Sequence, residues 1–223
     1  MKQYLILLVL PIIFSCKKTE EAPQFEQNTY FESPQPINDS ELNKFPSKFR
    51  GLYVNKDSTY LRIGENVILT ESYFRFRIHK KEIDSLKKEF DISDDKLIQK
   101  KTKQVYDFLN KGDSLEIIDK NTDTIFRLSN SQKAKRINGQ LVLSTKDSIF
   151  WTVKLFSLEK NTLRIRYIYS KEDLKRMDSI TKIKSATIDS MSFIVKPTRR
   201  EFKKILNLKH FGYENQYNKI LKL

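Results

Sequence analysis

The chain has little of several residue types that catalytic and metal sites commonly use. It contains one cysteine, Cys16, so no disulfide can form within the chain. Its two histidines, His79 and His210, stand alone, without the spacing that places two zinc ligands on one helix face. Its five glycines form no phosphate-binding loop, and the Gly-x-Ser-x-Gly of a nucleophile elbow is absent. These patterns therefore identify no catalytic, metal-binding or cofactor-binding residues.

The composition is that of a folded and strongly basic protein. The 223 residues are enough for one large domain or two small ones. Fifteen phenylalanines and ten tyrosines are too many for a disordered chain, and five glycines with six prolines are too few for a collagen-like one. The net charge of +14 is uneven, because residues 16–45 are weakly acidic and residues 46–223 strongly basic. The charge points to anionic surroundings.

The first sixteen residues have the pattern of an export signal. Lys2 precedes an apolar run over residues 4–14, which is too short to span a bilayer, and the small residue Ser15 precedes Cys16. A lone cysteine directly after such a run resembles the signal of bacterial lipoproteins. The resemblance implies cleavage before Cys16 and attachment of acyl chains such as palmitate to it. The alternative is an ordinary signal peptide, or an uncleaved anchor, with a chance cysteine.

The resemblance also carries an expectation about location. Lys17 stands where aspartate would favour inner-membrane retention in some Gram-negative sorting systems. We therefore expect a protein anchored in the cell envelope by Cys16, at the outer membrane, facing the periplasm or the cell surface. Residues 1–15 would be the signal peptide. Residues 16–45, with Pro23, Pro34 and Pro36 and no sustained periodicity, would be the lipidated cysteine and a flexible tether.

Residues 46–223 read as a single β-rich globular domain. Alternation and β-branched or aromatic residues predict strands. These strands cover residues 51–54, 59–63, 66–70, 73–80, 114–119, 124–128, 140–145, 148–158, 162–169 and 192–196. Strands that precede most of the helices predict an α+β fold. It would be mainly an antiparallel β-meander, a barrel or a sandwich, with two or three short helices mostly towards the C-terminus.

Two helices have clear start signals. Ser170 and Asp173 form a capping-box pattern before residues 171–180, and Thr198 and Glu201 form another before residues 199–207. Residues 81–109 fit either a helix or a further hairpin. Residues 120–123, Lys-Asn-Thr-Asp, are typical of a hairpin turn. The segment from Asp119 also resembles the start of a calcium loop, but it lacks the glycine and glutamate that such a loop needs.

One surface feature stands out as a candidate site. In the strand over residues 73–80, Phe74, Phe76 and Ile78 alternate with basic residues, so we expect these apolar side chains to face the core. The opposite side would join basic residues of neighbouring strands in an anion-binding face. Its candidate residues are Arg62, Arg75, Arg77, His79, Arg164 and Arg166. The alternative is an ordinary solvated sheet face.

These features favour a non-catalytic binding or structural module of the cell envelope. A basic protein would often bind nucleic acid, but an export signal argues against nucleic acid. The expected partners are the membrane, through Cys16, and either a protein or an anionic glycan or lipid of the envelope. No cofactor is expected. The alternative function is an extracytoplasmic hydrolase whose active site is assembled from residues scattered along the sequence.

Overall fold

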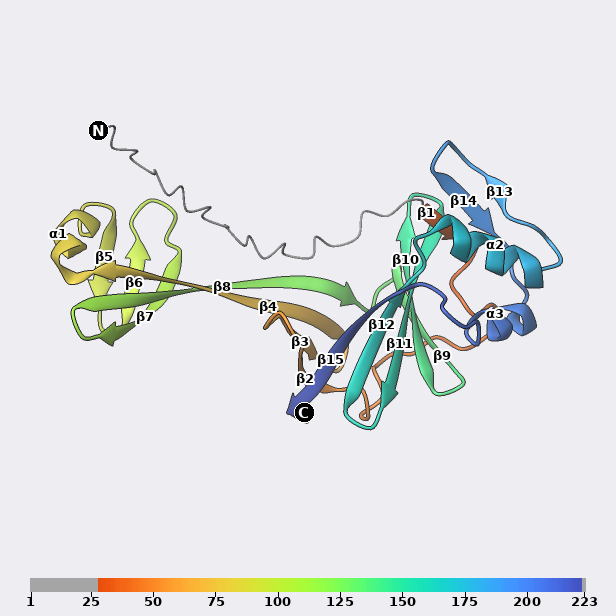
Figure 1. The fold of residues 1–223 in the computed structure, drawn as a ribbon, viewed down its shortest axis with the longest axis horizontal. Coiled ribbons are helices and arrows are strands. Elements are labelled where there is room, and N and C mark those ends of the chain that lie inside the picture. Colours follow the sequence, from red (N-terminus) through yellow and green to blue (C-terminus); the bar gives the residue numbers. More distant parts are fainter. Residues whose placement is uncertain (1–27, 222–223) are drawn as a thin grey trace, which may run out of the picture.

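The computed structural model describes residues 28–221 and shows two folded parts joined by a long two-stranded ribbon (Figure 1). The ribbon consists of β4 (Val67–His79) and β8 (Ser114–Arg127), which pair antiparallel from Val67↔Arg127 to His79↔Ser114. Residues 80–113 and the adjoining ends of both strands form a distal module. The remaining described residues form the body. The ribbon thus holds the distal module away from the body.

All strands belong to one open sheet. In the body they are β1 (Asn28–Phe31), β2 (Gly51–Val54), β3 (Tyr60–Ile63), β9 (Gln132–Ile137), β10 (Gln140–Asp147), β11 (Phe150–Glu159), β12 (Thr162–Tyr167), β13 (Ala186–Thr187), β14 (Ser192–Val195) and β15 (Tyr213–Leu221). The main path runs β13-β14-β1-β11-β12-β15-β2-β3-β4-β8-β7-β6-β5, and β10 joins β11 to β9. The described pairs are antiparallel except β1 with β14. The predicted α+β class, mainly antiparallel with few helices, is confirmed.

The body has two cores, one on each face of the β10–β11 pair. Successive strand side chains point to opposite faces, so Phe156 of β11 packs in the first core and Leu155 in the second. Leu141, Val142 and Leu143 of β10 are all buried for the same reason. A continuous apolar run is typical of a strand covered on both faces.

Two helices cover the second core. They are α2 (Lys171–Ile180) and α3 (Arg199–Ile205), and both capping boxes predicted from the sequence are present. Met177 of α2 and Phe202 of α3 are fully buried in that core. A capping box satisfies backbone N–H groups that the first turn leaves without partners. Local hydrogen bonding therefore fixes where both helices begin.

The distal module has a small core of its own. It contains β5 (Phe90–Ser93), β6 (Lys96–Gln99), β7 (Val105–Lys111), a 3-10 helix at Lys80–Glu82 and α1 (Ile83–Leu86). Leu97, Phe108, Leu115 and Ile117 are buried together, and Ile83 of α1 packs against them. Residues 81–109, which fit a helix or a hairpin from the sequence, form both.

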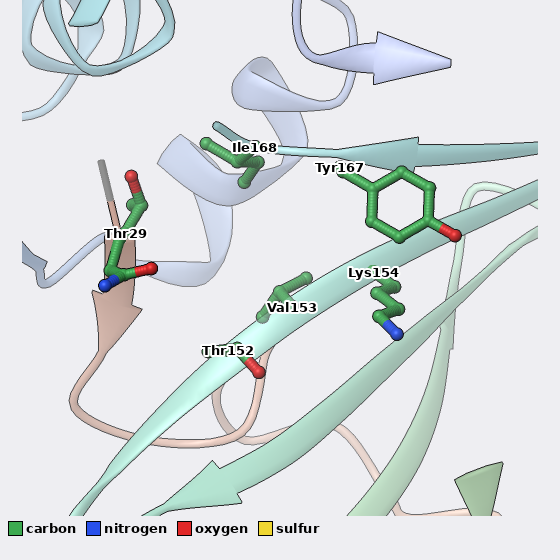
Figure 2. Close-up of a pocket in the computed structure, with 7 residues that line it drawn as sticks. Thr29, Thr152, Val153, Lys154, Tyr167 and Ile168 are labelled. Atoms are coloured by element: carbon green, nitrogen blue, oxygen red, sulfur yellow. The ribbon is translucent and has the colours of Figure 1, made fainter. Parts of the chain in front are cut away.

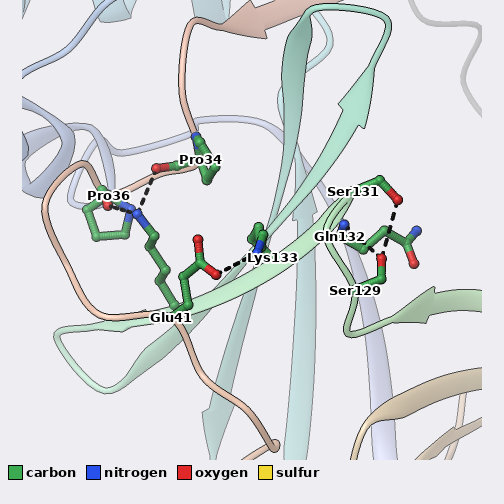
Figure 3. Close-up of polar contacts among 8 residues, drawn as sticks. Pro34, Pro36, Glu41, Ser129, Ser131, Gln132 and Lys133 are labelled. Carbon is green, nitrogen blue, oxygen red and sulfur yellow. Dashed lines mark hydrogen bonds and ion pairs between the residues drawn. The ribbon is translucent and has the colours of Figure 1, made fainter.

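The predicted tether is wrong for residues 28–45, which are part of the body. Phe31 and Phe45 are fully buried. Lys135 Nζ donates hydrogen bonds to the carbonyl oxygens of Pro34 at 3.1 Å and Pro36 at 2.9 Å (Figure 3). The prolines lack N–H donors but keep their carbonyl acceptors, and a lysine distant in sequence uses these. Residues 16–27 lie outside the described residues, as does the predicted signal peptide.

The predicted hairpin turn at residues 120–123 is also wrong. These residues lie within β8, and Asn121 pairs with Ser72 of β4. The resemblance of this segment to a calcium loop therefore has no counterpart, because the backbone is extended. Pairing with the long strand β4 outweighs the turn preference of Asn and Asp, which is a weak local tendency. The chain instead turns back within the distal module.

Candidate functional site

The structure does not bring the six residues of the predicted anion-binding face together. Arg62 lies on β3, Arg164 and Arg166 lie on β12, and β15 and β2 separate these strands. Three strand spacings amount to about 14 Å. Arg75, Arg77 and His79 lie further away, along the ribbon towards the distal module. The prediction required β3, β4 and β12 to be neighbours in the sheet. Only β3 and β4 are adjacent.

Acidic partners also occupy most of these basic groups. On the ribbon, Arg77 contacts Glu116 at 3.3 Å, and His79 Nε2 lies 3.5 Å from Asp113. On β12, Arg164 and Arg166 both face Glu214, at 3.6 and 3.7 Å. Except for Asp113, which lies in the turn before β8, the acidic partners stand on strands next to those of the basic residues. They leave little unpaired charge for one bidentate anion site.

The remaining pair, Arg62 with Glu71, lies where the ribbon leaves the body. Arg62 Nε donates to Glu71 Oε1 at 2.9 Å, and Lys120 Nζ and the Tyr73 hydroxyl lie 3.3 and 3.2 Å from Oε2. Glu71 is 5% exposed and pairs with Tyr60 in the last register position of β3 on β4. The hydrogen bond from Arg62 holds the pKa of Glu71 below its usual range. This cluster ties the base of the ribbon to the body.

Beyond that cluster the ribbon exposes apolar side chains. Phe74 is 67% exposed and Phe76 is 38% exposed, with their ring centroids 5.9 Å apart. The prediction that these residues face a core is wrong. They share one side of β4 with Ile68, which is buried in the first body core, and with Ile78, which packs in the distal module. The apolar side is covered at both ends of the ribbon and bare between them.

The ribbon also leaves one edge of β4 open. β3 stops pairing with β4 at Glu71, so residues 72–79 of β4 pair only with β8 in the described part of the chain. Their sequence, SYFRFRIH, is rich in residues that favour strands and has no Gly or Pro. Within residues 28–221, the Arg75 side chain has no ion pair or hydrogen bond. An open strand edge of this composition is a template for another strand.

The other open edge of the ribbon has a different composition. β7 pairs with β8 only up to Ile118, so the edge of β8 beyond that point has no neighbour among the described strands. It carries Lys120, Asn121 and Asp123, residue types that disfavour strand addition. The contrast indicates that the β4 edge, rather than the β8 edge, is suited to a partner.

A second candidate site is a cavity in the body, where two strands share one edge of β11. β1 meets this edge at Phe31↔Trp151, and β12 joins it only from Tyr167↔Lys154. The gap between them holds a cavity of about 190 Å³, which we call the fork cavity (Figure 2). Its lining residues are Asn28, Thr29, Thr152, Val153, Lys154, Tyr167 and Ile168.

Lys154 is the notable group of the fork cavity. Its ammonium lies 5.5 Å from the centre of the Tyr167 ring, and it makes no ion pair with any described residue. Burial lowers the pKa of Lys154 and raises that of Tyr167 to about 12. The sequence patterns did not single out this site, although the sequence of β11 contains one indication of it. Lys154 shares one side of β11 with Phe150, Phe156 and Leu158, where Thr152 is the other polar residue.

No cluster of catalytic groups stands out in the part of the chain that the structure describes. Among residues 28–221, no three His, Cys, Asp or Glu side chains form a group suited to a metal ion. The fork cavity contains neither histidine. None of the helices in the described part is long and apolar enough to cross a membrane. No known family model matches the chain, and neither the curated proteins nor the solved structures include a significant match to it.

Proposed function

We propose that this protein is a lipid-anchored, non-catalytic component of the cell envelope that binds a partner protein along its ribbon. The open edge of β4 is the observation that carries the proposal. Among the described residues, it combines unpaired backbone groups with two exposed phenylalanines and an arginine that lacks an acidic partner. In strand addition, backbone hydrogen bonds provide affinity and alternating side chains provide specificity.

The side chains define the partner that fits this edge. Phe74 and Phe76 lie on one side of β4, and Arg75 and Arg77 lie on the other. A strand added beside them would gain most from alternating apolar and acidic residues, because cross-strand neighbours on the same side interact. We therefore propose an extended segment of an acidic partner protein, and we favour it over an envelope polymer, which has no strand to add.

The proposed anchor fits this arrangement. If Cys16 carries the lipid, the stretch from Cys16 to Asn28 spans at most about 40 Å when fully extended. Asn28 belongs to β1 in the body, and the ribbon leads away from β1 (Figure 1). The body would stay near the outer membrane while the ribbon and distal module reach a partner. Whether the protein faces the periplasm or the cell surface depends on the side of the outer membrane on which that partner lies.

Site-specific photocrosslinking in cells tests this proposal. A photoreactive residue replaces Ser72 or Phe74 on the ribbon or, as a control, Ile149 in an exposed turn of the body. We expect the two ribbon positions to give an adduct of one defined mass that protease degrades, and the control position to give none. Equal adducts from Ile149, no adduct from the ribbon, or an adduct that resists protease would each contradict a protein partner on β4.

A further inference from the structure

The fork cavity exists because β1 and β12 cannot both follow β11 to its middle. β1 also pairs in parallel with β14, and β12 pairs with β15, so the two strands diverge from the shared edge. Val153 lies in the gap with no strand opposite it on that edge among the described residues. The cavity is therefore formed by the backbone arrangement of β1, β11 and β12. It is not a gap between flexible surface side chains.

Two polar groups of this cavity lack a hydrogen-bonding or ionic partner among the described residues. Thr29 is 6% exposed, and its hydroxyl has no hydrogen bond within the described part of the chain. The ammonium of Lys154 has no carboxylate beside it there. Buried hydroxyl groups are almost always hydrogen-bonded in native proteins, and even a half-buried charge such as that of Lys154 is costly without an ionic partner. Both groups are thus suited to contacts that a ligand would provide.

The two groups lie on different sides of the gap. Val153 and Lys154 are consecutive in β11, so their side chains point to opposite faces of the sheet. In the view of Figure 2, Thr29 and Ile168 lie on one side of Val153, and Lys154 and Tyr167 lie on the other. A ligand of the cavity would meet a cation at one end, apolar side chains in the middle and a hydroxyl at the other end.

We propose that the fork cavity binds a small organic monoanion, a monocarboxylate whose short apolar body ends in a hydrogen-bonding group. Lys154 supplies one positive charge, which matches one carboxylate better than a doubly charged phosphate. Val153 and Ile168 contact the apolar body, and the Thr29 hydroxyl bonds to the far end. The cavity of about 190 Å³ suits such a molecule, since a cavity of about 150 Å³ holds benzene. This site is independent of the ribbon.

Binding of three matched probes tests the proposal. The full chain in detergent is titrated calorimetrically with 4-hydroxybenzoate, with benzoate and with the neutral 4-hydroxybenzamide. We expect saturable binding with affinity falling in the order 4-hydroxybenzoate, benzoate, 4-hydroxybenzamide. The carboxylate gains a charge-assisted hydrogen bond, which corresponds to about tenfold or more in affinity over the amide. Saturable binding of none of the three, or equal binding of carboxylate and amide, would overturn the proposal.

Three variants locate the binding. Lys154→Met keeps the side-chain length and should weaken 4-hydroxybenzoate about tenfold or more, and Lys154→Gln should do the same. Thr29→Val should weaken 4-hydroxybenzoate about threefold to tenfold, while benzoate affinity stays unchanged. Lys146→Met, at an exposed lysine of β10, is the control and should change neither affinity. Unaltered binding in a folded Lys154 variant, or an equal loss in the control, would place the ligand elsewhere.

Discussion

Arg62 Nε lies 2.9 Å from Glu71 Oε1 at the position where β3 stops pairing with β4. This ion pair joins the body to the base of the ribbon. Lys120 of β8 adds a second cation to the same carboxylate, so one buried acid links three strands. The charge of Glu71 therefore helps to hold the base of the ribbon against β3.

Glu71→Gln should lower stability at neutral pH. The pKa of Glu71 is lowered in the folded protein, so its contribution is present above its unfolded value and is lost as pH falls through the folded value. We expect a loss of about 1–3 kcal/mol at pH 7, because a hydrogen-bonded buried charge is removed. Urea unfolding of both proteins at pH 7 and in strong acid measures it. A difference that stays the same in acid would contradict this role.

The ribbon and the distal module should respond differently to truncation of an aromatic residue. Phe74→Ser should change the free energy of unfolding by less than about 0.5 kcal/mol, because most of the ring is in water. Phe108→Ala, in the distal core, should cost about 3–5 kcal/mol within that module. Chemical denaturation measures both effects. A large loss for Phe74→Ser would mean that the ribbon packs against another part of the protein.

Hydrogen exchange on the Phe108→Ala variant separates the two folded parts. Because the distal core shares no buried residue with the body cores, amides of residues 90–111 should exchange faster while those of β10 and β11 keep their protection. The wild-type protein is the reference. Faster exchange throughout the body would show that body and distal module unfold as one unit.

Substitution of Cys16 tests the proposed lipid anchor. Cys16→Ala should move the protein from the membrane fraction to the soluble fraction, because the acyl chains provide the proposed membrane affinity. Fractionation and mass spectrometry of the wild type and the variant measure this. A variant that remains membrane-bound and full-length would show that residues 1–16 are an uncleaved anchor.

Sequence patterns predicted those features that depend on local interactions. The capping boxes of Ser170 and Thr198 act within one helical turn, so both helix starts could be located. Alternation also grouped Phe74 with Phe76 correctly on one side of β4. It could not show whether anything covers that side, because coverage depends on segments far away in sequence. A two-stranded ribbon has no core in its middle.

The other differences between the sequence-based predictions and the structure have the same physical origin. Pro34 and Pro36 suggest a tether until Lys135, about a hundred residues later, is seen to bind their carbonyl groups. Asn121 favours a turn until its pairing with Ser72 is known. Lys154 becomes unusual only because β1 and β12 meet the same edge of β11. Contacts between residues far apart in sequence decide each case, and no pattern in a single sequence reveals such contacts.

The dependence of partner capture on the β4 edge tests the central claim most directly. Crosslinking from Ser72 is compared in the parent chain, in a Phe74→Ser and Arg75→Glu double variant, and in a Val105→Ser and Leu109→Ser control. The control removes two exposed apolar residues of the distal module. We predict that the β4 variant loses most of the adduct while the control keeps it, and that both proteins melt as the parent does. Full adduct yield in the β4 variant, or equal loss in the control, would contradict partner binding along the ribbon.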